Sequence, residues 1–304
     1  MSFSGVSLGG QISRASLRGR TQGSEQSAKP IAFLVVLWIA LLISFSFLIV
    51  LLITTFIDGL DRLDLRLITN YPSADPQQAG LRPAILGSLW VIGTVAFMTI
   101  PLGVAAAVHL EELANKHNRF NRFVELNVQN LAAVPSIVYG LLALAALTAF
   151  GVKDKNIVIG GAVALGMLVL PVIVISTREA LRSVPLEIRQ GSLALGATPL
   201  QTIWRQTLPS AVPGIATGSI LALSRALGEA APLLVLGALV YLRFDPNGLL
   251  SGYTTMPIQI FNWTSRPQED FHVLASAGSI LLLVILLAMN AIAIVIRNRY
   301  QRRW

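Results

Sequence analysis

An arginine and a glutamate stand one helical turn apart in a stretch that is otherwise uncharged. Arg225 and Glu229 are the two charged residues between positions 206 and 242. That stretch exceeds the roughly 20 apolar residues needed to cross a bilayer. Charge is costly in hydrocarbon, so an ionisable pair at such depth should face a protein interior or an aqueous path. The pair is therefore the first candidate for a solute pathway.

The chemistry of this pair suits an anionic solute. A guanidinium stays charged at any relevant pH and offers a planar fork of donors that matches an oxyanion. Glu229, at i+4, can neutralise Arg225 in a resting state, and an arriving anion can compete for the same donors. We expect this exchange of partners to gate passage. The alternative is that the pair fixes the packing of its helix.

The composition places these residues in a polytopic membrane protein. Of 304 residues, 54% are hydrophobic and 12% are charged, and the mean hydropathy is +0.68. We predict an all-α fold with a basic, mobile N-terminal arm over 1–30 and a transmembrane domain over 31–304. Six runs are long enough to span a bilayer, at about 31–57, 83–108, 126–152, 156–177, 210–242 and 271–296.

The distribution of positive charge predicts the orientation in the membrane. With the N-terminus inside, the inner segments carry fifteen Lys and Arg residues and the outer segments seven. Because cytoplasmic segments carry the excess, both termini should be cytoplasmic. These flanking charges account for the net charge of +8. We therefore expect membrane lipid, and not nucleic acid, as the partner of these positive residues. The chain has no cysteine, which excludes thiol chemistry.

The segment over 178–209 reads as a helix, a turn and a second helix. Pro185 suits a helix start and Gly196 a helix end. We expect Thr198, Pro199 and Gln201 to be the N-cap, first-turn proline and capping-box partner of the second helix. The apolar side chains of the whole segment over 178–209 are better placed in a partner's groove than in water.

This loop resembles the cytoplasmic signature of ABC importer permeases. That signature reads Glu-Ala-Ala, three residues, Gly, nine residues, Ile, any residue, Leu-Pro. The chain keeps the glycine and the closing Leu-Pro, and it replaces the opening triplet and the isoleucine, the latter by Gln206. The resemblance implies that an ATPase contacts this loop, at Gln190, Gly191, Ser192, Gly196, Leu208 and Pro209.

Three further blocks resemble the phosphate-specific permeases of the Pst system, A-type (PstA). They are NLAAVPSIVYGLLAL from Asn130, ALSRALGEAAPLLVLGA from Ala222 and MPIQIFNWTSRP from Met256. The resemblance implies the type I importer permease fold and an ATP-driven importer of inorganic phosphate in the bacterial plasma (inner) membrane. It also implies a second, PstC-like permease, two PstB-like ATP-binding subunits and an extracytoplasmic PstS-like binding protein.

The chain itself should be a non-catalytic permease that binds no cofactor. It contains no G-x-x-x-x-G-K-[ST] phosphate loop, so ATP and Mg should be used by a partner chain. A permease for sulfate or molybdate is the closest alternative, followed by an ion-coupled carrier and a membrane enzyme. The last is disfavoured because the three histidines are scattered.

Two weaker sets of pathway candidates remain. Pro135 loosens the backbone beside the hydroxyls of Ser136 and Tyr139, and Arg178 and Arg182 follow the fourth span. Packing and charge anchoring are the competing explanations. Small residues also recur every four positions in the fifth span and predict a ridge for close helix approach, at Gly214, Gly218, Ala222, Ala226 and Ala230.

Overall fold

The computed structural model describes residues 28–114, 118–238 and 241–300. It divides into two units, residues 1–53 and 54–304. The first contains most of helix α1 (Ala28–Gly59), an apolar helix long enough to cross a membrane. Most of the predicted arm over 1–30 lies outside the described residues, and α1 begins three residues before the predicted span.

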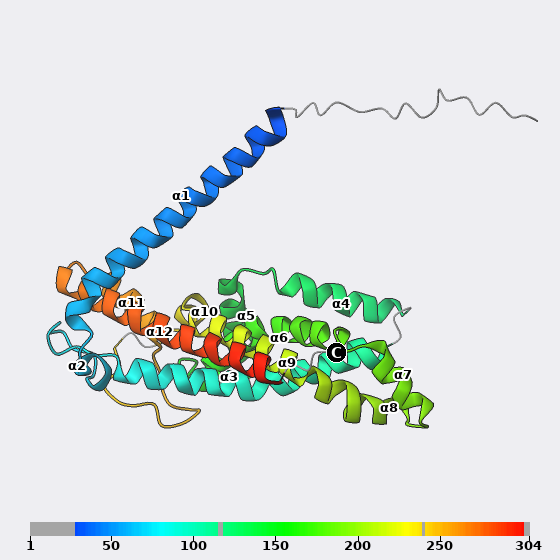
Figure 1. Ribbon diagram of the computed structural model, residues 1–304. Coiled ribbons are helices and arrows are strands. Elements are labelled where there is room, and N and C mark those ends of the chain that lie inside the picture. The colour runs from blue at the N-terminus through cyan, green and yellow to red at the C-terminus, as the bar shows by residue number, and fades with distance from the viewer. Residues whose placement is uncertain (1–27, 115–117, 239–240, 301–304) are drawn as a thin grey trace, which may run out of the picture. The chain divides into compact units, whose positions relative to one another are not determined.

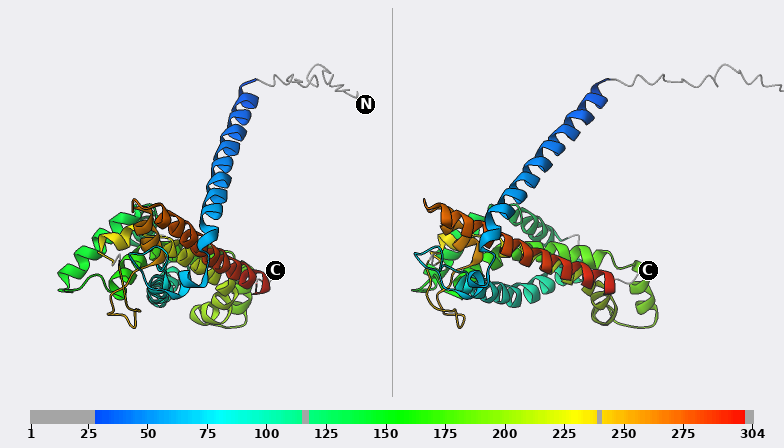
Figure 2. Two further views of the ribbon diagram at one scale, coloured as in Figure 1. Left: turned by 90° about the vertical axis from the view of Figure 1, so that its left-hand side faces the viewer. Right: turned by 60° about the vertical axis from the view of Figure 1, so that its left-hand side comes forward.

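Four long helices form the second unit (Figures 1 and 2). They are α3 (Arg82–Val108), α6 (Val158–Arg182), α9 (Leu208–Leu227) and α12 (Glu269–Tyr300). Helix α6 packs against both α3 and α9, and α12 packs against α9. Buried residues are spread along the whole length of α6, so it is the central helix of this unit.

Short elements connect the long helices. Two of them are π-turns, η3 and η4, which extend α3 and precede α9. The full set is η2 (Leu60–Arg62), α2 (Leu65–Thr69), η3 (His109–Leu113), α4 (Arg119–Leu131), α5 (Ser136–Ala149), α7 (Leu186–Ala194), α8 (Pro199–Thr202), η4 (Ile203–Thr207), α10 (Ala231–Val235) and α11 (Met256–Thr264).

The third predicted span is not one straight helix. Five described helices are long and apolar enough to cross a membrane, and α4 with α5 makes a sixth only if this pair, bent by 113°, counts as one span. Residues 132–135 break the helix because Pro135 has no N–H to donate and disfavours helical geometry in the residue before it. The predicted span over 126–152 is therefore a pair of helices bent at the loosened backbone around Pro135, and its crossing of the membrane as one span stays a prediction.

The fifth predicted span is also shorter than expected. Helix α9 ends at Leu227, and Gly228 is its C-cap. The chain re-forms one helical turn in α10 and then runs without helix through the described residues up to α11. The prediction of one span over 210–242 is wrong at its C-terminal half, and Glu229 consequently lies outside the helix that carries Arg225.

The predicted ridge of small residues lies against α6 at Gly214 and Gly218, whereas Ala230, its last predicted member, lies beyond the end of α9. A Cβ added at Gly214 would lie 2.8 Å from the Cβ of Ala180, and one added at Gly218 would lie 2.6 Å from the Cβ of Ser176. Such spacing leaves no room for larger side chains. The two helices that flank the 183–207 segment are thus held in close contact.

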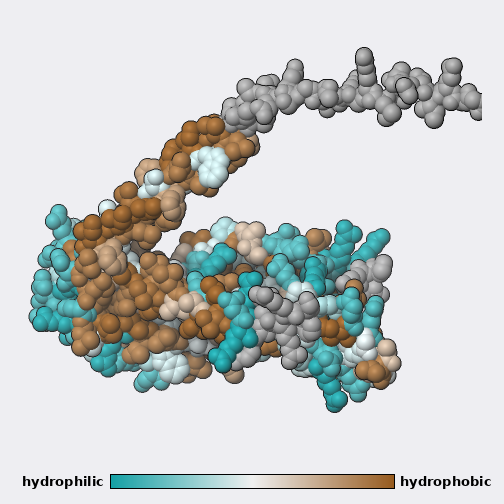
Figure 3. Space-filling view, in the orientation of Figure 1, coloured by the Kyte–Doolittle hydropathy of each residue, from teal (hydrophilic) through white to brown (hydrophobic). Residues whose placement is uncertain are grey.

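The surface of the second unit matches a membrane setting. Hydrophobic side chains cover the face over α11 and α12, and hydrophilic side chains gather at the two ends of the helices (Figure 3). A band of this kind is what a bilayer requires of a bundle of spanning helices. Helices α7 and α8 lie together at one end of the bundle (Figure 1).

Candidate functional site

The structure brings Arg225 and Glu229 together where α9 stops. Arg225 occupies the last turn of α9, where the negative end of the helix dipole stabilises a cation. Its Nε lies 3.9 Å from Oε1 of Glu229, which is an ion pair beyond hydrogen-bonding distance. The side chain of Arg225 is 57% exposed and that of Glu229 is 22% exposed. The guanidinium therefore faces the outside of this chain and does not fill its core.

A polar groove of about 410 Å³ lies between α6 and α9. It is lined by hydroxyl groups together with the charged residues Glu179 and Arg297; the hydroxyl-bearing residues are Ser176, Ser183, Ser210 and Thr217. Leu221 also lines the groove, and Arg225 follows Leu221 by one helical turn. Residues at i and i+4 share a helix face, so Arg225 continues the face of α9 that borders this groove.

The predicted helix–turn–helix is present as the hairpin α7–α8. Gly196 forms the turn with φ +84°, a conformation that favours glycine. The predicted capping box is confirmed, because Thr198 Oγ1 accepts from the Gln201 N–H and Gln201 Oε1 accepts from the Thr198 N–H. The hydroxyl oxygens of Ser192 and Thr202 lie 2.9 Å apart and join the two helices. Contacts within the hairpin thus hold its two helices together.

The residues expected to meet an ATPase separate into two groups. Gly191 and Ser192 line a groove of about 400 Å³ on the hairpin, next to the exposed Gln190. Leu208 and Pro209 instead begin α9, beyond the π-turn η4, and Leu208 packs against an internal apolar cluster. Contact of these positions with an ATPase stays a prediction.

An ion-pair network joins the ends of several helices beside this hairpin. Arg178 on α6 donates to Glu111 at 3.2 Å and to Glu125 at 2.7 Å. Arg182, one turn later, lies 2.9 Å from Glu111. Arg189 on α7 donates to Glu112 at 2.7 Å. The side chains of Arg178 and Glu111 are only 7% and 5% exposed.

This network changes how the weaker candidates are interpreted. Arg178 is closed in by carboxylates of its own chain, whereas Arg182 is 54% exposed. Sequence reasoning missed the carboxylates that hold them, although three acids lie close together in the chain, at Glu111, Glu112 and Glu125. Their pairing depends on helix packing, which the sequence does not show. Pathway roles for the two arginines stay predictions.

Tyr139 has a structural partner as well. Its side chain is buried, and its hydroxyl donates to the carbonyl of Leu131 across the break between α4 and α5. Pro135 is exposed and Ser136 is half-buried at the start of α5. The hydroxyl of Tyr139 closes the bend, and a role of these three residues in a solute path stays a prediction.

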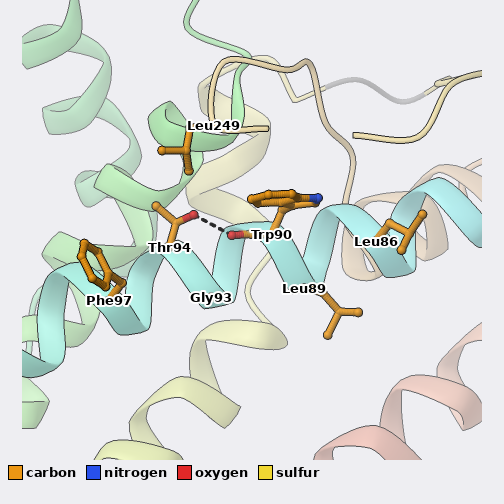
Figure 4. Close-up of a pocket in the computed structure, with 7 residues that line it drawn as sticks. All are labelled: Leu86, Leu89, Trp90, Gly93, Thr94, Phe97 and Leu249. Carbon is orange, nitrogen blue, oxygen red and sulfur yellow. Dashed lines mark hydrogen bonds between the residues drawn. The ribbon is translucent and has the colours of Figure 1, made fainter. Parts of the chain in front are cut away.

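An apolar groove along α3 has no means of holding an oxyanion. It measures about 470 Å³ and lies along α3, where Trp90, Thr94 and Phe97 line it with Leu249 from a distant loop (Figure 4). The hydroxyl of Thr94 is directed to the carbonyl of Trp90 at 2.7 Å. No lining residue is charged, so a lipid chain or an apolar side chain suits this groove better.

Comparison with known families identifies the kind of protein to which these features belong. Residues 99–304 match the family described as binding-protein-dependent transport system inner membrane component. The chain belongs to this family. The match includes α6, the hairpin α7–α8, α9 and the break after it.

Individual relatives extend the match across most of the chain. The probable ABC transporter permease protein YqgI of Bacillus subtilis is 34% identical over 252 residues, covering 78% of this chain and 84% of the relative. The phosphate transport system permease protein PstA 1 of Mycobacterium tuberculosis H37Rv is 32% identical, covering 75% and 73%. PstA of Haemophilus influenzae is 29% identical, covering 83% and 88%.

Solved structures show the same fold. A bacterial alginate ABC transporter matches 91% of this chain with a TM-score of 0.60 at 17% identity, covering 99% of that chain. The MetNI methionine ABC transporter matches 76% with a TM-score of 0.59 at 16% identity, covering all of that chain. The protein is thus a permease subunit with the type I ABC importer fold, and it is an inner membrane component of an ABC transporter. Permease subunits of this family are non-catalytic and imply partners such as an ATPase and a binding protein.

Proposed function

We propose that this chain is the PstA-like permease of an importer for inorganic phosphate. It would form half of the translocation path beside a PstC-like permease, with two PstB-like ATPases and a PstS-like binding protein. The support is the similarity to permeases named for phosphate transport, together with one structural observation. That observation is an exposed arginine at the end of α9, on the helix face that continues a hydroxyl-lined groove.

The exposure of Arg225 bears on the packing explanation. A guanidinium that is 57% exposed adds little to the packing of its own chain. It still needs a polar environment inside a membrane. A water-filled path shared with a second permease supplies one, and a passing oxyanion can accept from the planar fork.

The weak contact with Glu229 suits a transient hold on the anion. At 3.9 Å the carboxylate offsets the charge of Arg225 without occupying its donors in a close hydrogen bond. A phosphate that binds therefore displaces little, which replaces the exchange of partners expected from the sequence, and Glu229 repels the anion once the path opens onward. The carboxylate thereby keeps the affinity of the path low enough for release.

The same proposal assigns the hairpin α7–α8 to the ATPase and the cytoplasm. Both termini would then be cytoplasmic, and ATP and Mg would be bound by the partner chains. Leu195 at the hairpin turn is 90% exposed, and Leu186 at its start is 63% exposed. Apolar side chains so exposed at a hydrophilic end fit a protein groove.

Uptake of radiolabelled inorganic phosphate tests this assignment. The chain is expressed with its partner subunits in cells that lack other phosphate importers. We expect Arg225→Gln to lower uptake by about tenfold or more and Arg225→Lys to retain part of it, because lysine keeps the charge and loses the fork. Arg243→Gln, at an exposed loop position, is the matched control and should transport normally.

Competing anions distinguish phosphate from its relatives. Arsenate, which shares the charge and shape of phosphate, should compete for uptake, and sulfate and molybdate should not. Wild-type uptake in both Arg225 variants, at equal membrane abundance, would overturn the role of Arg225. Competition by sulfate or molybdate at low excess would instead assign the importer to that anion.

A further inference from the structure

The arginine of helix α7 makes three contacts that tie this helix to two others. Arg189 Nη2 donates to Glu112 of η3 at 2.7 Å and to the carbonyl of Leu181 on α6 at 2.8 Å. Its Nη1 donates to the carbonyl of Val184 at 3.1 Å. The side chains of Arg189 and Glu112 are 19% and 11% exposed. One guanidinium therefore joins α7 to the ends of both α3 and α6.

The π-turn at the end of α3 presents two successive acids to different partners. Glu111 pairs with Arg178 and Arg182 of α6, and Glu112 pairs with Arg189 of α7. π-turns within helices are rare, and those that occur often lie at functional sites. The end of α3 is thereby fixed to α6 and to α7 at the same place.

The α7–α8 hairpin, which carries Arg189, is held together as a rigid unit. Its two helices are joined by the contact between Ser192 and Thr202, and α8 is closed by its capping box. A displacement of the hairpin cannot be absorbed within it without breaking these bonds. The displacement then passes to the elements that hold the hairpin, which are the continuous helix α8–η4–α9 and, towards α3, the link between Arg189 and Glu112.

We propose that Arg189 and Glu112 are positioning residues that transmit displacement of the α7–α8 hairpin to the inner-facing end of α3. The inference rests on membership in the ABC importer family and not on the identity of the solute. A buried ion pair adds little net stability compared with apolar packing, and its best-supported use is to fix one arrangement of its neighbours. Helix α3 packs along α6, so its displacement reaches the helices that border the polar groove.

Coupling between ATP hydrolysis and uptake tests the transmission step. In the purified, reconstituted importer, Arg189→Gln and Glu112→Gln should each keep ATP hydrolysis within about twofold while the phosphate moved per ATP falls about tenfold. Arg122→Gln, which removes an exposed charge from α4, is the matched control and should keep the wild-type ratio. An unchanged ratio in both network variants would overturn the proposal, as would a parallel loss of hydrolysis and uptake in correctly assembled importer.

A distance measurement decides the same question without a transported solute. The chain has no cysteine, so Leu113→Cys in η3 and Ala194→Cys in α7 accept spin labels at two exposed positions only. With Arg189 and Glu112 intact, the label distance should be the same in the ATP-free and the vanadate-trapped importer. A change of about 5 Å, equal to one helical turn, would overturn the proposal.

The two experiments also separate the failures of the two proposals. If the importer moves no phosphate, the phosphate assignment fails, and the label distance still decides whether the hairpin and α3 move together. In the Glu112→Gln background, the label distance should change between the two nucleotide states, because the arginine then holds α6 alone. An unchanged distance in that background would mean that other contacts carry the link, and the proposal would be wrong.

Discussion

Gly218 of α9 lies so close to Ser176 of α6 that an added Cβ would stand 2.6 Å from both the Cβ and the Oγ of the serine. Both residues border the polar groove. The groove therefore exists beside a helix contact that tolerates no additional atom.

This contact predicts a large effect from a small substitution. Gly218→Ala should destabilise the chain by about 1–3 kcal/mol, because overpacking a tight contact forces the helices apart. Thermal unfolding of the detergent-purified chain measures it. Gly93→Ala, in α3 with nothing within 4 Å of the added Cβ, should be neutral or stabilising by comparison. Equal melting temperatures for the two variants would contradict the close approach.

The bend between α4 and α5 predicts a stability effect for Tyr139. Removing the hydroxyl in Tyr139→Phe takes away the bond to the Leu131 carbonyl and should cost about 1 kcal/mol. The readout is the melting temperature together with uptake by the surviving folded importer. A loss of uptake with an unchanged melting temperature would point to a pathway role for Tyr139.

Arg178 and Arg182 should differ sharply although they share the partner Glu111. Arg178→Gln breaks a buried pair and should cost about 3–5 kcal/mol, because Glu111 and Glu125 lose their buried partner. Arg182→Gln removes a half-exposed contact and should cost about 0–1 kcal/mol. Membrane abundance and melting temperature compare the two variants. A more harmful Arg182→Gln would refute the burial argument.

Tyr253, which precedes α11, predicts a response to alkaline pH. Its hydroxyl is buried and bonds to none of the residues that the structure describes. Burial raises the pKa of Tyr253 above its usual value of 10.0. The folded state thus holds this proton more tightly, and the stability that results is present below pH 10 and lost as the pH rises above it.

The corresponding measurement compares Tyr253→Phe with the parent chain at pH 8 and pH 11. The variant has no ionisable phenol at this position, so its free energy of unfolding should fall less between pH 8 and pH 11 than that of the parent chain. The difference should be about 1.4 kcal/mol for each full unit of pH above the unfolded pKa. It should also tolerate the change at pH 8, because the hydroxyl bonds to no described residue. An identical alkaline loss in both chains would show that Tyr253 ionises readily in the folded state.

The sequence was most informative where chemistry is local. The hairpin α7–α8 could be predicted from Gly196, Thr198 and Gln201, because turns and caps depend on neighbouring residues. Hydropathy likewise indicated the long helices, because burial in lipid requires a continuous apolar run.

The sequence did not show where a helix bends or ends, nor which charged residues pair. Residues 126–152 are uniformly free of charge, so hydropathy did not reveal the bend at residues 132–135, although Pro135 marks it. The fifth span looked long for the same reason, since residues 228–242 are as apolar as α9. Arg178 and Glu111 are separated by 67 residues and Arg189 and Glu112 by 77, so packing decides which charges meet.

The self-closed hairpin affects how the importer assembles. Its turn, its cap and the Ser192–Thr202 contact are already formed in the isolated chain. A subunit that docks there meets a surface whose shape is set beforehand, so little conformational entropy is lost on association. Assembly then depends chiefly on the match between two rigid surfaces, and a loosened turn at Gly196 would weaken association even if every contact residue were unchanged.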